Sequence, residues 1–226
     1  MNKIIVLFFI MSFAIVAQTF KVEKVSGKVL ALRGTSENWT DIKQGDKLSG
    51  SDLLVTGENS YIQLSKDASS FLLKSNSALG LNSIKKLSVD ELLLALASEE
   101  IKNVPKNKSD SKTKTTAVYG SKIDNKLAAT IPANDLGLKK INGAKQLAES
   151  GFKESSVLVA KETFRKYPDM QKRISDRIYF ADILERLGVY DEAYSEFLKI
   201  NGLAMKDSER SIVKAKLESL SKKISK

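Results

Sequence analysis

The 226-residue chain contains no cysteine and no histidine, three prolines and a single tryptophan. It therefore forms no disulfide, no Ser-His-Asp or Cys-His catalytic arrangement, and no zinc site built on imidazole or thiolate. Carboxylates alone could hold a hard cation, but no Asp-rich loop with calcium-binding spacing is present. We expect a protein that is not an enzyme, has no metal or cofactor, and is held by ordinary hydrophobic cores.

The charge balance is basic, because 37 Lys and Arg residues face 27 Asp and Glu residues, a formal net charge of +10. Such a surplus favours acidic partners such as anionic lipid head groups or envelope polymers. From Lys102 to Lys126 seven lysines stand against two aspartates, and this stretch contains a Lys-rich loop at residues 103–116. The candidate contacts to an anionic surface are Lys106, Lys108, Lys112 and Lys114. The alternative is a solvated loop that binds nothing, and the scarcity of aromatic residues there argues against nucleic acid.

The N-terminal stretch at residues 1–17 carries a positive charge at Lys3, followed by an apolar run from Ile4 to Val16. This run is shorter than the roughly 20 apolar residues that span a bilayer. It is typical of a secretory signal peptide, with cleavage expected after Ala17, and a retained anchor is the alternative. We expect an exported protein in the periplasm or cell envelope of a Gram-negative-type bacterium, with no transmembrane segment after signal removal.

Short strands are expected between residues 20 and 81, where apolar residues alternate and turn residues recur. Trp39 is expected to anchor the core or a turn. Asp46 and Asp52 stand beside glycine or serine, where aspartate accepts hydrogen bonds from backbone N–H groups. A glycosidase carboxylate pair is the alternative reading, and no substrate-binding aromatic residues accompany it.

The same stretch resembles a FecR-type domain, through a tryptophan, a Gly-Asp turn and an Asp-x-Leu-x-Thr-Gly element. Here these positions are Trp39, Gly45, Asp46, Asp52, Thr56 and Gly57. The resemblance implies an all-β module over residues 18–126, a β-roll or β-helix, although the alternation alone equally allows a sandwich or barrel. Residues 116–123 are expected to supply a closing strand. Ser88 and Glu91 form a capping box that predicts a helix inserted at 89–102.

After a linker at 127–134, residues 135–226 form a predicted all-helical domain with an internal repeat. Ala144 aligns with Ala181 and Gly151 with Gly188 when the chain is shifted along itself. The second unit resembles a tetratricopeptide repeat at Ala181, Gly188, Tyr190, Ala193 and Phe197. Helices are expected at 136–150, 152–167, 170–187, 190–200 and 208–224, the last as a terminal cap. A partner groove would use Lys145, Arg173, Arg177 and Tyr179.

Together these features predict a multi-domain β plus α protein that is exported and non-catalytic. It would bind protein partners or anionic envelope components as a scaffold or adaptor. One alternative, taken from the FecR resemblance, is a periplasmic signal-sensing component of a sigma-factor regulatory system. A carboxylate-dependent envelope glycan hydrolase is the other.

Overall fold

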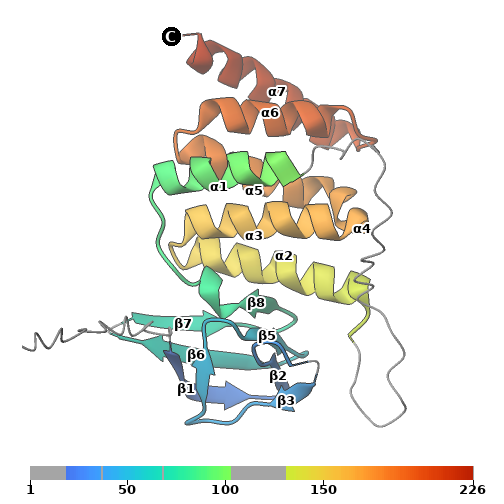
Figure 1. The fold of residues 1–226 in the computed structure, drawn as a ribbon. Coiled ribbons are helices and arrows are strands. Elements are labelled where there is room, and N and C mark those ends of the chain that lie inside the picture. The colour runs from blue at the N-terminus through green and yellow to red at the C-terminus, as the bar shows by residue number, and fades with distance from the viewer. Residues whose placement is uncertain (1–18, 37, 68, 103–130, 226) are drawn as a thin grey trace, which may run out of the picture.

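The computed structural model describes residues 19–36, 38–67, 69–102 and 131–225. A β part occupies one end of the molecule and the helices stack above it (Figure 1). Within these ranges, no helix combines the length and apolar character needed to cross a membrane. The expected signal peptide, the Lys-rich loop, the closing strand at 116–123 and linker residues 127–130 lie outside the described residues.

The β part consists of two four-stranded sheets whose described pairs are all antiparallel. The first sheet has the order β4-β1-β6-β7, with β1 at Thr19–Ser26, β4 at Lys47–Ser49, β6 at Tyr61–Lys66 and β7 at Ser69–Leu73. The second has the order β3-β2-β5-β8, with β2 at Val29–Leu32, β3 at Trp39–Asp41, β5 at Leu53–Thr56 and β8 at Ala78–Gly80. Mixed β and α structure is confirmed, and a β-helix, whose strands pair in parallel, does not describe this part.

The predicted alternation is present in β2, β6 and β7, where alternate residues are buried in one shared core, whereas β5 and β8 bury consecutive residues. Phe20 and Ile62 from the first sheet meet Ala31 and Leu54 from the second in the same hydrophobic cluster. The chain passes from one sheet to the other at Gly27, where φ is +70°. A side chain at this position would begin 2.3 Å from the Ser60 hydroxyl oxygen, so the crossing requires glycine.

The helical part contains seven α-helices in the described residues, preceded by a short 3₁₀ helix, η1, at Leu81–Ser83. Their bounds are α1 Val89–Lys102, α2 Ala133–Glu149, α3 Lys153–Lys166, α4 Pro168–Gln171, α5 Ile174–Arg186, α6 Tyr190–Asn201 and α7 Asp207–Ile224. Four of the five helices predicted for the C-terminal part match α2, α3, α6 and α7 closely. The exception is the single helix expected at 170–187. Pro168 starts a separate short helix, and Arg173, with ψ of 78°, breaks it from α5.

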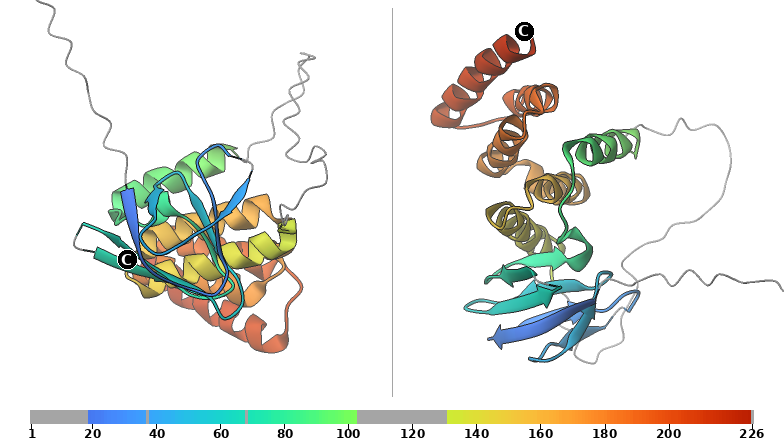
Figure 2. Two further views of the ribbon diagram at one scale, coloured as in Figure 1. Left: turned by 90° about the horizontal axis from the view of Figure 1, so that it is seen from below. Right: turned by 90° about the vertical axis from the view of Figure 1, so that its left-hand side faces the viewer.

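Helix α1 has the predicted bounds but packs against the other helices. Its capping box is present: the Ser88 N–H donates to Glu91 Oε2 at 2.7 Å, and the Glu91 N–H donates to Ser88 Oγ at 3.2 Å. Leu92 and Leu96 belong to the hydrophobic core of the helical part, and α1 lies beside α3 (Figure 2). The sequence placed this helix in the β module because the periodicity of a segment does not reveal its packing partner.

Three of the five repeat positions lie in the core, as the helical spacing predicted. Ala181, Ala193 and Phe197 are at most 2% exposed. Gly188 adopts φ of +78° in the turn between α5 and α6, a conformation that suits glycine. Tyr190 is half-buried, and Lys223 of α7 lies 5.0 Å from its ring centroid. The α2–α3 and α5–α6 pairs therefore stack, and α7 covers the last pair.

Candidate binding surface on the helical repeats

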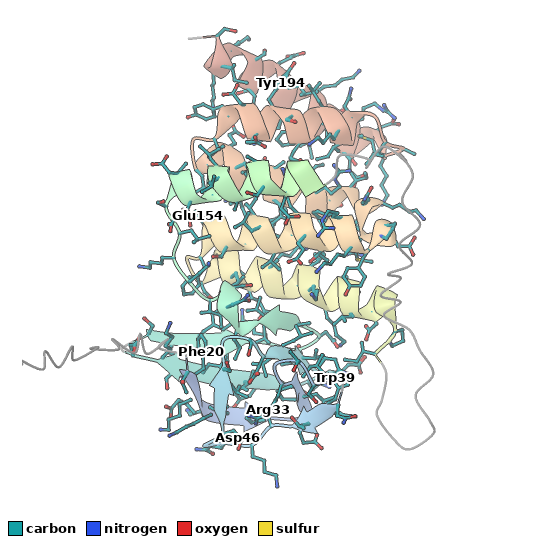
Figure 3. All side chains as sticks on the ribbon, in the orientation of Figure 1. Phe20, Arg33, Trp39, Asp46, Glu154 and Tyr194 are labelled. Carbon is teal, nitrogen blue, oxygen red and sulfur yellow. The ribbon has the colours of Figure 1, made fainter. Side chains whose placement is uncertain are left out.

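The two candidate carboxylates of the β part hold its turns together. Asp52 is 3% exposed, and its two oxygens accept hydrogen bonds from the backbone N–H groups of Gly34 at 3.0 Å and Ser49 at 2.9 Å. Asp46 accepts from the Lys43 N–H at 3.0 Å and lies toward the end of the β part that is remote from the helices (Figure 3). The predicted turn role of both residues is confirmed, and the oxygens of Asp52 are already used by the backbone.

The remaining motif positions also have structural contacts. The buried Thr56 hydroxyl donates to the Lys74 carbonyl at 2.7 Å and accepts from the Ser77 N–H at 3.0 Å. The Gly57 N–H donates to the Lys28 carbonyl at 2.8 Å, and Gly45 turns the chain with φ of +88°. Trp39, which was expected to anchor the core or a turn, lies half-buried on the edge strand β3 and outside the β core cluster.

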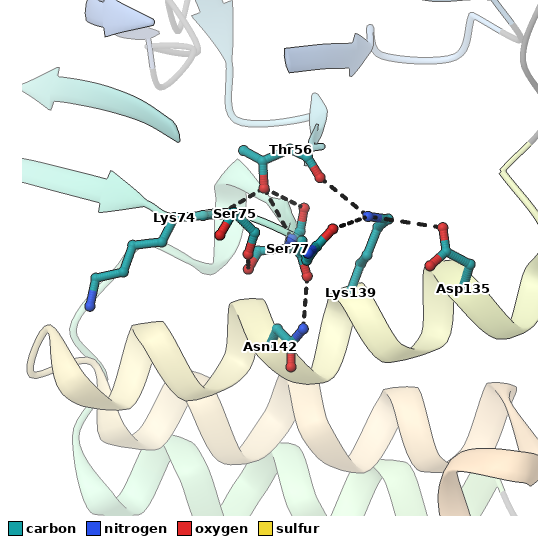
Figure 4. A network of polar contacts seen from close by, with 8 residues as sticks. Thr56, Lys74, Ser75, Ser77, Asp135, Lys139 and Asn142 are labelled. Atoms are coloured by element: carbon teal, nitrogen blue, oxygen red, sulfur yellow. Dashed lines mark hydrogen bonds and ion pairs between the residues drawn. The ribbon is translucent and has the colours of Figure 1, made fainter. Parts of the chain in front are cut away.

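Helix α2 joins the helical part to the β part through polar side chains that the sequence did not single out. Lys139 is 9% exposed, and its Nζ donates to the Thr56 carbonyl at 3.3 Å and to Asn76 Oδ1 at 3.2 Å. One turn further along, Asn142 Nδ2 donates to the Asn76 carbonyl at 2.8 Å (Figure 4). The Lys139 contact gives the buried Thr56 carbonyl a partner under α2, whereas Asn142 bonds to the carbonyl of the exposed Asn76.

The junction continues toward the C-terminal end of α2. Gln146 Nε2 donates to Ser77 Oγ at 2.7 Å, and its Oε1 accepts from the Lys74 N–H at 2.7 Å. Between these polar contacts the backbones approach closely, because a side chain on Gly143 would begin 2.2 Å from the Ala78 carbonyl oxygen. Leu147 completes the junction by burying its side chain in the β core. The two parts therefore form one continuous body.

Three of the four residues expected to line a partner groove are brought together. Asp176 of α5, whose side chain is 5% exposed, bonds to both Lys145 Nζ of α2 and Arg173 Nε. The same Lys145 ammonium lies 5.7 Å from the ring centroid of Tyr179. Burial raises the pKa of the Tyr179 hydroxyl, Glu149 raises it further and Arg186 opposes the rise, so the ring presents a neutral phenol. We call Lys145, Arg173, Asp176 and Tyr179 the α2–α5 cluster.

Arg177, the fourth expected residue, does not join this cluster. It is separated from Tyr179 by about 200° around the helix axis and faces α3 and α6. Its guanidinium lies 3.5 Å from Glu196, which Lys161 also approaches at 3.1 Å. Burial favours the neutral form of Glu196, but Lys161 and Lys199 outweigh burial and lower its pKa. Arg177 instead lines a different hollow, of about 300 Å³, together with Lys161 and Glu196, so it does not share a surface with Lys145 and Tyr179.

A hollow of about 570 Å³ adjoins the α2–α5 cluster between the start of α5 and the start of α7. Its lining includes the cations Lys172, Arg173 and Lys206 and the carboxylates Asp176 and Glu209. Hydrogen bonds from Ser175 Oγ and the Lys206 N–H lower the pKa of Glu209, which favours its ionised form. With Lys145 included, cations outnumber carboxylates on this surface. Among the described residues, no group of three or more acidic side chains converges as metal ligands would.

Comparisons of the chain with family models, with curated proteins and with solved structures found no match. The choice of the α2–α5 cluster as the candidate binding surface therefore depends on its geometry alone. Three of its residues were predicted from their exposed positions on the helices. Asp176 was missed, although its spacing of three residues from Arg173 is a signal for an ion pair on a helix.

Proposed function

We propose that this chain is a non-catalytic, exported cell-envelope protein that serves as a binding scaffold or adaptor. In this proposal a FecR-like β module carries tetratricopeptide-like repeats, and the α2–α5 cluster with its adjoining hollow takes the partner. The observation that carries the proposal is the arrangement of Lys145, Arg173 and Tyr179 around the single carboxylate of Asp176. Two cations share one anion there, so the cluster keeps a positive charge beside an aromatic ring.

The charge and the shape of the surface favour a protein segment that bears a carboxylate. Arginine binds carboxylates through paired hydrogen bonds, and the Arg173 side chain is 44% exposed despite its contact with Asp176. Ile174 and Met205 give the hollow an apolar component. A partner segment that pairs an acidic residue with an apolar one fits this combination. The junction of α2 with β8 would hold the surface at a fixed position on the β module.

Photo-crosslinking in the exporting cell tests this function. A benzophenone amino acid replaces Tyr179 in the cluster and, as matched controls, Tyr194 of α6 and Tyr61 of β6. We expect a discrete adduct from position 179 that is lost when Arg173→Glu is added. Equal adducts from all three positions, or none from position 179, would overturn the proposed binding surface. A glycan-cleaving activity that Asp46→Asn or Asp52→Asn removes from a folded protein would contradict the non-catalytic assignment.

A further inference from the structure

Another cavity, of about 390 Å³, lies where the first sheet meets the helical part. Its apolar wall includes Phe20 of β1, Leu64 of β6 and Phe71 of β7, with Ile84 after η1 and Phe152 between α2 and α3. Phe20 lies in the half of the β part that is nearer the helices (Figure 3). Ligand cavities in proteins typically have volumes of about 300–1,000 Å³ with largely apolar walls. This cavity therefore has the size and lining of a small-molecule site.

The apolar wall is rigidly held. Phe71 and Phe152 meet edge to face with ring centroids 6.1 Å apart. The segment that carries Ile84 is fixed by the Ser155 hydroxyl, which donates to the Lys85 carbonyl at 2.7 Å. Phe20 and Phe71 are at most 4% exposed and belong to the β core. The folded core thus fixes the side chains that form the cavity before a ligand arrives. Preformation lowers the free-energy cost of ordering these side chains when the ligand binds.

The cavity rim is cationic. Lys66, Lys85 and Lys86 line it, with Asp67 as the one carboxylate among the lining residues. Lys66 Nζ lies 5.6 Å from the Phe20 ring centroid. None of the three lysines makes an ion pair with a carboxylate in the described part of the chain. Unpaired positive charges beside an apolar wall are the arrangement that attracts a ligand with an apolar body and an anionic end.

We propose that this cavity binds a small amphipathic carboxylate, a single apolar chain or ring with one negative group. The apolar body would lie against Phe71 and Phe152, and the carboxylate would lie at the lysine rim. This site is separate from the α2–α5 cluster and does not depend on the proposed scaffold role. Because β7 and the α2–α3 turn both line it, the bound molecule would contact both parts of the protein at once.

Titration calorimetry with decanoate as the probe tests the proposal on the purified exported protein. Decanol and decyltrimethylammonium serve as neutral and cationic controls of the same chain length. We expect saturable one-site binding of decanoate, weaker binding of decanol and no binding of the cation. The triple variant Lys66→Gln, Lys85→Gln, Lys86→Gln should bind decanoate about tenfold more weakly, because three partly exposed ion pairs contribute roughly 1–2 kcal/mol in total.

Two further variants keep the test specific. Ser69→Trp, at an exposed rim position, should block the cavity and abolish binding without altering the core. The matched triple variant Lys24→Gln, Lys28→Gln, Lys43→Gln makes the same change in net charge elsewhere on the β part and should bind decanoate normally. Binding that survives Ser69→Trp, or that falls equally in both triple variants, would overturn the proposal. So would binding to phosphatidylglycerol vesicles without binding to decanoate.

Discussion

Gly143 offers the sharpest test of the junction between the two parts of the molecule. The change Gly143→Ala places a methyl carbon 2.2 Å from the Ala78 carbonyl oxygen. Backbone oxygen in a paired strand cannot rotate away, so helix α2 must lift from β8. Overpacking of this kind costs about 1–3 kcal/mol, and lifting weakens the hydrogen bonds of Lys139 and Asn142, each worth about 1 kcal/mol. Alanine recovers roughly 1 kcal/mol through its helix propensity.

The expected net loss is about 3 kcal/mol, or roughly 6–12 °C in Tm for a protein of this size. Gly137→Ala is the matched control in the same helix, because its methyl group would meet the Tyr167 and Met170 side chains at 3.0 Å and 3.1 Å. Side chains can adjust, so we expect Gly137→Ala to change stability by less than about 1 kcal/mol. Urea and thermal unfolding measure both variants. A Gly143→Ala protein as stable as the parent would refute the close approach of α2 to β8.

Three further outcomes are expected. Asp52→Asn should lower the free energy of unfolding in urea by about 1–3 kcal/mol, because an amide offers one acceptor oxygen where two backbone N–H groups need acceptors, and the more exposed Asp46→Asn should cost less. Hydrogen bonds from Lys216 and then Lys223 lower the pKa of Glu185 below its ordinary 4.5. Their stabilising contribution is therefore present above that value and lost as the pH falls through the folded-state pKa. Unfolding measured at several acidic pH values should show a shallower decline for Glu185→Gln, and an unchanged slope would contradict the assignment. Mass spectrometry of the exported protein should find Gln18 as its first residue, whereas an intact Met1 in the membrane fraction would favour a retained anchor.

Local features of the structure followed from the sequence. Helix α1 was indicated by the capping box at Ser88 and Glu91 and by the recurring leucines. The turn between α5 and α6 was indicated by Gly188, two residues before Tyr190. These signals are local, since a helix end or a tight turn depends on residues within a few positions. The alternation in the β part likewise identified its strands but not their division into two sheets, which depends on pairing between distant residues.

The junction and the sites near it were not predictable in the same way. The sequence did not single out Lys139, which contacts carbonyl and amide oxygens 83 and 63 positions away in the chain. Gln146 and Asn142 likewise have partners that no periodicity indicates. The cavity wall combines Phe20 with Phe152, which come together only once both parts have folded. Composition identifies such residues as polar or apolar, and tertiary packing decides their roles.

The position of α1 also affects how the protein can acquire its structure. Glu99 pairs with Arg165 at 3.0 Å across 66 positions of sequence, so α1 emerges during synthesis well before the helix that receives it. A fragment ending at residue 130 would leave Leu92 and Leu96 without their core, and the exposed leucines would favour aggregation. Ordering of α1 must wait for α3, and contacts of such long range slow folding. A division of the chain before Ser88 would therefore keep α1 with its helical core, whereas a division at the linker that the composition suggests would separate them, and either division removes Leu147 from the β core.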